Sequence, residues 1–266
     1  HYYRGARGDE SEAAFVERIT GNLEQLILDE GPETIAAFIA EPVTGASGVI
    51  VPPAGYYERV QAILEKYDIL FWADEVITGF GRTGNLFGCE TMNIHDPAQM
   101  TFAKQLSSAY YPISASVIRG DMYDAMVEPS AKVGVFGHGY TYSGHPVACA
   151  AALKTLEIYA RDDLYANAAE MGRHLQTRLA ELRDHEAVGE VRGAGLIAAV
   201  ELVEDKAAKT PAVDMAKRAT NLCQHNGLIV RNVAGNALAL CPPLIINREQ
   251  VDEIVDKLKL SIDQAV

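Results

Sequence analysis

The sequence predicts an α/β fold with a mainly parallel sheet, followed by a smaller α+β region. Two apolar runs of strand length, Ile35–Ala40 and the run that starts at Ile69, flank an amphipathic stretch at Pro53–Tyr67. Strand, helix and strand at this spacing form a βαβ unit, so the two strands should be parallel. Continuous apolar character suits strands that are buried on both faces. Both runs end in an acid, Glu41 and Asp74.

The remaining elements follow from periodicity and from glycine and proline breaks. Helices are expected at 12–30, 146–160, 164–182, 213–225 and 248–262, and strands at 99–103, 113–118, 188–203, 228–231 and 237–240. The alanine-rich stretch 146–160 is apolar nearly all round, which predicts a buried helix. We expect residues 1–155 to belong to a large domain and residues 156–266 to form a small C-terminal domain.

Composition and charge exclude several classes of protein. The 266 residues are 48% hydrophobic and 22% charged, which are globular values. A net charge of −13 argues against nucleic-acid or anionic-membrane partners, because both attract basic surfaces. Four cysteines lack paired or metal-ligand spacing, which indicates reduced thiols in a cytoplasmic protein. No membrane-span or signal-peptide pattern is present, and the scattered histidines predict no metal site.

An acid and an amine mark the ends of two expected strands. Asp74 follows one apolar run, and Lys104 follows the short run Gln99–Ala103. In an open α/β sheet the chemistry gathers at the carboxyl ends of the strands, so both side chains should face one crevice. A lysine that loses solvation there would have a lowered pKa and could form a Schiff base with an aldehyde cofactor.

Several motifs, in chain order, resemble the class III (omega-type) aminotransferases, which are pyridoxal-phosphate enzymes of fold type I. They are EPVTGASGVIVPP at 41–53, DEVITGFGRTG at 74–84, TFAK at 101–104, GYTYSGHP at 139–146, VRGAG at 191–195 and CPPL at 241–244. Each motif is short, but the combination spans nearly the whole chain. The resemblance implies a large domain with a mainly parallel sheet and a smaller α+β C-terminal domain. It also implies that the N-terminal portion of the family is missing, including its phosphate-binding turn.

The resemblance assigns roles to the matching residues. Lys104 is expected to hold pyridoxal 5'-phosphate as a Schiff base and to move the substrate proton as general base and acid. Asp74 is expected to keep the ring nitrogen protonated, so that the ring withdraws electrons. Val76 is expected to pack on one ring face. Thr141 is expected to reach the phosphate held by the other subunit, which implies a homodimer or dimer of dimers with shared sites.

Two arginines and one acid have weaker assignments. Arg231 ends the run Leu228–Arg231, and a guanidinium there could pair with a substrate carboxylate. On general grounds a surface arginine is equally compatible with the pattern. Arg192, in VRGAG, is interpreted as structural. Glu41 stands at a strand end and is a lower-ranked candidate for lining the site.

One motif suggests a different class of enzyme. The stretch Gly79–Gly84 matches G-x-G-x-x-G, which in dinucleotide-binding proteins directly follows a strand and opens a helix. Here five residues separate it from the strand, and the residues after it have no helical period. A glycine-rich loop that lets the backbone pass close to a ligand or another chain is therefore favoured. A nicotinamide-dependent oxidoreductase remains the alternative from this motif.

The resulting hypothesis is a transaminase that moves an amino group from an amine or ω-amino acid to a keto acid, with pyruvate as the favoured acceptor. Two other functions are compatible with the same motifs. One is another pyridoxal-phosphate reaction, such as that of an aminomutase, racemase or decarboxylase. The other is a catalytically silent fragment, because the upstream phosphate-binding turn is absent from this sequence.

Overall fold

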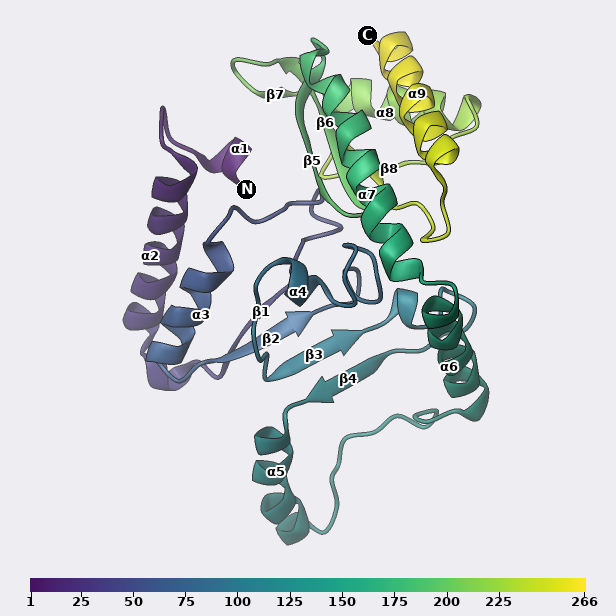
Figure 1. Cartoon of the computed structure of the whole chain (residues 1–266). Helices are drawn as coiled ribbons and strands as arrows, with labels where there is room; N and C mark the ends of the chain where they lie inside the picture. Colours follow the sequence, from purple (N-terminus) through teal and green to yellow (C-terminus); the bar gives the residue numbers. More distant parts are fainter.

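The computed structural model describes residues 1–266, and it contains two separate sheets (Figure 1). The first sheet has the order β1-β2-β3-β4. Its strands are β1 (Ala37–Ala40), β2 (Leu70–Asp74), β3 (Gln99–Phe102) and β4 (Ala115–Ile118). The β1–β2 and β2–β3 pairs are parallel, whereas the edge strand β4 runs antiparallel to β3. The predicted βαβ unit is thus confirmed.

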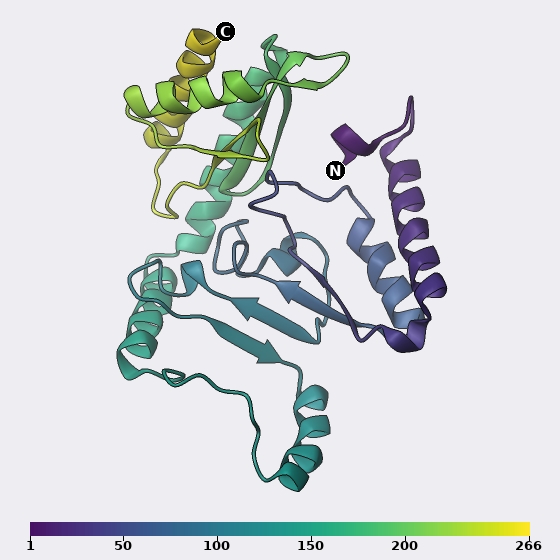
Figure 2. The same ribbon diagram turned by 180° about the vertical axis from the view of Figure 1, so that it is seen from behind.

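Two helices cover one side of this sheet. These are α2 (Glu12–Glu30) and α3 (Tyr56–Lys66), which lie side by side next to β1 and β2 (Figures 1 and 2). The Ser11 side chain caps α2 by accepting a hydrogen bond from the Ala14 amide. Tyr57 and Phe71 belong to the apolar cluster between helices and sheet. The short α1 (Tyr2–Gly5) precedes this layer, and α4 (Gly88–Thr91) follows β2.

The second sheet is antiparallel and has the order β5-β6-β9-β8, with β7 paired to β6. Its strands are β5 (Val188–Ala194), β6 (Ile197–Asp205), β7 (Thr210–Pro211), β8 (Arg231–Val233) and β9 (Ala237–Leu240). Its helices are α7 (Leu164–Ala180), α8 (Val213–His225) and α9 (Arg248–Ala265). The largest apolar cluster of the protein fills the space between this sheet and these helices. Burial of that apolar area stabilises this part of the chain.

Three sequence predictions of local structure are wrong, and one helix was missed. Residues 188–203 form a hairpin, β5 and β6, because Gly195 turns the chain with a φ of +57°. Arg231 begins a strand and does not end one. The helix α6 (Pro146–Arg161) is buried on one side only, with Leu153 69% exposed. The helix α5 (Gly120–Val133), which contains Pro129, was not predicted at all.

The helix α6 lies beside the first sheet and contacts the turn Lys104–Leu106 (Figure 1). It is followed directly by α7, which runs up against the second sheet (Figure 1). The expected division between residues 155 and 156 falls inside α6, and this boundary stays a proposal. The first residues of the chain contact the second sheet, since His1 and Arg4 pair with Glu190 and Glu201.

The loop Gly79–Gly84 joins the two sheet regions. Arg82 donates from Nη1 to the carbonyl oxygens of Leu196 (3.0 Å) and Pro242 (2.6 Å), and the Leu196 amide donates to the Arg82 carbonyl (2.9 Å). The loop consists of turns and does not open a helix directly after β2, so the dinucleotide-binding context is absent. Its glycines instead let the backbone approach other segments of the same chain.

Gly195 should tolerate no side chain, because a Cβ there would lie 2.4 Å from the Thr83 carbonyl carbon. We expect Gly195→Ala to destabilise the protein by about 3 kcal/mol or more, from overpacking added to left-handed strain. Gly8→Ala is the matched control, since Gly8 has a φ of +51° and nothing within 4 Å. Thermal unfolding of both variants separates the clash from the strain. Equal losses of stability would contradict the close approach.

Candidate active site at the ends of β2 and β3

Asp74 is the last residue of β2. The parallel register pairs Asp74 with Thr101 of β3, so the residues that follow Thr101 leave the sheet at the same edge. Asp74 Oδ1 accepts a hydrogen bond from the Val76 amide at 3.0 Å, a local turn that orients the carboxylate. The other carboxylate oxygen has no hydrogen-bond partner within the chain. This oxygen can therefore accept a hydrogen bond from a ligand.

Lys104 lies three residues after Thr101, just past the end of β3. Its φ of +41° places it in the left-handed region, which is uncommon for a residue with a side chain. Such strain often accompanies functional positions, because the surrounding structure must hold it in place. The side chain is exposed in this chain. The prediction that Lys104 loses its solvation is therefore wrong here.

Lys104 lines a hollow of about 410 Å³ between the two sheet regions. Arg231 lines the same hollow, so the structure brings together two residues that are 127 positions apart (231 − 104). Arg82 is the third positive residue on its wall, and no aspartate or glutamate is present among the 14 lining residues. Three cations without an acid create a positive potential that favours an anionic ligand.

Asp74 lines a neighbouring hollow of about 530 Å³, together with Glu41 and Tyr57. The loop after β1 borders both hollows, since Glu41 lines this one and Gly45 lines the other. Glu41 accepts a hydrogen bond from the Gly45 amide at 2.9 Å, which fixes the loop between them. The structure therefore places Asp74 and Lys104 at the same sheet edge but in adjacent hollows.

The neighbouring acid Glu75 has a different position. It is 1% exposed and accepts hydrogen bonds from the Thr78 hydroxyl (2.5 Å) and from the amides of Gly88 (2.9 Å) and Cys89 (2.7 Å). Burial, together with the nearby Glu75 charge, raises the pKa of the Cys89 thiol. Interior hydrogen-bond donors occupy both oxygens of the Glu75 carboxylate, so Glu75 holds the loop in place. Asp74 is the acid of this pair that lines a hollow.

Two predicted site residues lie elsewhere. Val76 is half-buried and lines neither the Lys104 hollow nor the Asp74 hollow. Thr141 is exposed in the segment between α5 and α6, and the N-cap position of α6 is occupied by His145, whose side chain makes no capping hydrogen bond. Both views show α5 and this segment extending away from the rest of the chain (Figures 1 and 2). Within one chain, Thr141 is not part of the Lys104 hollow.

Sequence reasoning did not find the roles of Arg82 and Gln105, which both line the Lys104 hollow. Arg82 is 8% exposed, and burial lowers the pKa of its guanidinium. The position of Arg82 inside a glycine-rich loop could have indicated its role, because such loops bring their side chains close to other backbone segments. Gln105 follows Lys104 directly, and its place in the cavity depends on the turn Lys104–Leu106.

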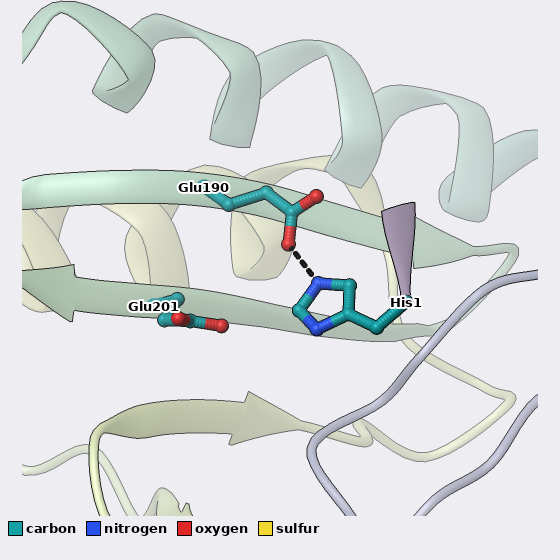
Figure 3. Close-up of side chains that lie close together, drawn as sticks. All are labelled: His1, Glu190 and Glu201. Carbon is teal, nitrogen blue, oxygen red and sulfur yellow. Dashed lines mark hydrogen bonds and ion pairs between the residues drawn. The ribbon is translucent and has the colours of Figure 1, made fainter. Parts of the chain in front are cut away.

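A cluster of charged residues lies apart from these hollows. His1, Glu190 and Glu201 offer three ligand atoms within 4.8 Å of one another (Figure 3). Arg192 Nη1 lies 2.6 Å from Glu190 and 2.5 Å from Glu201, so both carboxylates already have a buried cation. Arg192 also donates to the carbonyl oxygens of Gly48 and Val49, which supports its interpretation as structural. The cluster is an ion-pair network.

Comparison with known proteins places this arrangement in a family. Residues 3–262 match the family described as aminotransferase class-III. The chain is 46% identical over 260 residues to gamma aminobutyrate transaminase 3, chloroplastic, from Solanum lycopersicum, covering 97% of this chain and 50% of that protein. It spans about half the length of the curated relatives it matches. The chain belongs to the class-III aminotransferases, which depend on pyridoxal phosphate.

Solved structures agree with this fold. A transaminase with L-ala is 53% identical with a TM-score of 0.97, and the match covers 99% of this chain and 62% of that one. The omega transaminase from Pseudomonas jessenii in complex with PMP is 48% identical with a TM-score of 0.97, covering 100% and 59%. The fold type I architecture predicted from the sequence is therefore confirmed. No helix of this chain has the length and apolar character needed to cross a membrane.

The residues present fit pyridoxal phosphate. Lys104 offers an exposed amine on the wall of an acid-free hollow, and Asp74 offers a carboxylate oxygen without a partner at the same sheet edge. The aldehyde of the cofactor could react with the Lys104 amine, and its anionic phosphate suits the acid-free hollow. The protonated ring nitrogen of the cofactor could donate a hydrogen bond to Asp74. Lys104 and Asp74 are the residues of this chain suited to hold the cofactor.

The two adjacent acids should respond differently to amide substitution. We expect Glu75→Gln to destabilise the protein by about 2 kcal/mol, because an amide NH₂ replaces an acceptor that faces buried donors. Asp74→Asn should cost less than about 1 kcal/mol, since its Oδ1 still accepts from Val76, but it should abolish most activity. Thermal unfolding and activity of both variants check this. Equal stability losses would contradict the assignment.

Proposed function

We propose that this chain is part of a transaminase that moves an amino group from an amine or ω-amino acid to a keto acid, with pyruvate as the acceptor. The observation that carries the proposal is the shared hollow of Lys104 and Arg231, placed after β3 at the sheet edge where Asp74 ends β2. An amine for covalent attachment, an acid and a carboxylate-binding guanidinium are the groups that this chemistry needs.

Each residue has a separate task in this proposal. When bound, pyridoxal phosphate supplies an electron-withdrawing ring. Asp74 holds a proton on the ring nitrogen through its free carboxylate oxygen, which maintains the positive charge that draws electrons. Lys104 carries the proton between the substrate carbon and the cofactor carbon as base and then acid. Its position after β3, with one strained dihedral, keeps the amine at the cavity wall.

Arg231 is proposed to bind the substrate carboxylate. It is exposed on the edge strand β8 and shares its hollow with no acid, so its charge is available to a ligand. A guanidinium can hold a carboxylate with two parallel hydrogen bonds. Relatives named for gamma aminobutyrate support an ω-amino acid as one donor, and the transaminase structure with L-ala supports pyruvate as the acceptor, because amination of pyruvate gives alanine.

The exposed segment around Thr141 supports a homodimer with shared sites. Large apolar side chains are exposed on α5 and on the residues after it, and they are Tyr123, Val127, Val133, Val135, Phe136, Tyr140 and Tyr142. Many exposed large apolar side chains on one segment are typical of a surface that another chain covers. We propose that a second copy covers it and that Thr141 then binds the cofactor phosphate of the partner's site.

A cytoplasmic location is part of the proposal. All four cysteines are free thiols, which is usual in a reducing compartment. Relatives named chloroplastic and mitochondrial make an organelle the alternative location.

Reductive trapping tests the assignment of Lys104. The full-length protein is incubated with pyridoxal phosphate, reduced with borohydride and digested, and the labelled peptide is identified by mass spectrometry. We expect the label on Lys104, because it shares a hollow with Arg231 and follows β3 at the sheet edge where Asp74 ends β2. Lys154, on α6, lines a hollow of about 780 Å³ that also has no acid, so it serves as the internal control. A label on any lysine except Lys104 refutes the proposal.

Amino transfer to added pyruvate separates the transaminase from its rivals. An aminomutase, racemase or decarboxylase on this scaffold would bind the same cofactor without forming alanine. A catalytically silent chain would show neither the trapped lysine nor alanine formation. The transaminase predicts both results with the same purified protein.

Complementation tests the shared site. Lys104→Ala and Thr141→Ala variants of the full-length protein are co-expressed with different tags, and mixed dimers are purified. If Thr141 serves the partner's site, one site of each mixed dimer contains both native residues, and activity at limiting cofactor should recover. Each homodimer alone is the control. No recovery in the mixed dimer would contradict a site shared through Thr141.

A further inference from the structure

Arg82 connects the glycine-rich loop to the strands behind the cavity. Its Nη1 donates to Leu196, in the turn between β5 and β6, and to Pro242, just after β9. The Leu196 amide returns a hydrogen bond to the Arg82 carbonyl at 2.9 Å. One side chain from the β2 side of the molecule thus holds two separate segments of the second sheet region.

The segment held at Pro242 follows directly on β9, the strand that pairs with Arg231. Arg231 belongs to the three-residue edge strand β8, whose only partner in the sheet is β9. The register pairs Arg231 with Ala239, and β9 ends one residue later at Leu240. Pro242 follows two residues after that end. The hydrogen bond from Arg82 to Pro242 therefore restrains β9, and β9 in turn holds the strand that carries Arg231 on the wall of the Lys104 hollow.

The surroundings of Arg82 favour a functional role for this tether. Arg82 is 8% exposed and has only carbonyl acceptors, with no carboxylate paired to it. A buried guanidinium without an acid is costly, and apolar residues of similar volume often replace buried ions without loss of stability. Arg82 also lines the hollow with Lys104 and Arg231, so it contributes positive charge where an anion would bind.

We propose that Arg82 is a positioning residue that determines the affinity for acidic substrates. By holding Pro242 and Leu196 it sets the strand of Arg231 at the separation from Lys104 that a substrate carboxylate requires. This inference rests on the proposed function, because it concerns the carboxylate-binding role of Arg231. A plain amine has no carboxylate, so its reaction should not depend on this restraint.

The test compares two substrates in the full-length holoenzyme with Arg82→Met and Arg82→Lys. We expect Arg82→Met to raise the KM for pyruvate about tenfold, while the half-reaction with a plain amine, followed by cofactor absorbance, changes less than about twofold. Lysine keeps the charge and can still donate to the carbonyl oxygens, so Arg82→Lys should recover most of the affinity, leaving KM about threefold raised.

Arg218→Met is the matched control. Arg218 also donates to a backbone carbonyl, that of Ala265, at 2.9 and 3.2 Å, but it lies on α8 and lines no main hollow. Its pyruvate KM should equal that of the wild type. If Arg82→Met does not fold, Arg82→Lys decides alone: an unchanged pyruvate KM overturns the inference.

Two further results overturn the inference. One is an Arg82→Met enzyme whose pyruvate KM is unchanged, and the other is an equal loss in the amine and pyruvate half-reactions, which indicates a general structural defect. A wild-type enzyme that transfers no amino group overturns the proposed function together with this inference. An active wild type with a non-selective Arg82→Met variant overturns the inference alone.

Discussion

The parallel pairing of β2 with β3 is the constraint on which the site depends. It sets Asp74 opposite Thr101, and the chain continues from Thr101 to Lys104 at the same edge of the sheet. Adjacent parallel strands end at the same edge of the sheet, so an acid from one strand and an amine from the next can reach a common ligand. A shift of one residue in the register would turn Asp74 to the opposite face of the sheet.

The loop after β2 shows how one short motif serves two purposes. Asp74 faces a hollow, whereas Glu75 faces inward and binds the Thr78 hydroxyl and two backbone amides. Seven residues after Glu75, Arg82 donates hydrogen bonds to two backbone carbonyl oxygens of the second sheet region. The motif therefore combines a candidate cofactor ligand, an interior anchor and a contact between the sheets. Fixing the ligand through its own loop gives the carboxylate a defined direction.

The elements that could be predicted from the sequence are those whose pattern is local. The helix at 12–30 has apolar spacing and a clear stop at Gly31-Pro32, and its observed bounds agree. The hairpin within 188–203 was missed because β5 contains two glycines of its own and β6 begins with a long apolar run, so Gly195 did not stand out as the turn. The helix α5 was missed because it buries no residue and contains Pro129, which removes the usual amphipathic signal.

The site was predictable only in part for a similar reason. Lys104 and Asp74 follow apolar strands, which a single sequence shows directly. The meeting of Lys104 with Arg231 and Arg82 depends on how the two sheets are joined, and no spacing within either segment encodes that contact. The exposure of Lys104 could not be foreseen either, because burial depends on all the surfaces around a cavity.

The central claim is that Asp74 and Lys104 contact the same coenzyme ring. A crystal structure of the full-length protein crystallised with pyridoxal phosphate tests this most directly. The account predicts electron density continuous from Lys104 Nζ to the cofactor, with an Asp74 carboxylate oxygen within about 3 Å of the ring nitrogen. A cofactor bound through another lysine, or an Asp74 that remains in its own hollow away from the ring, would contradict it.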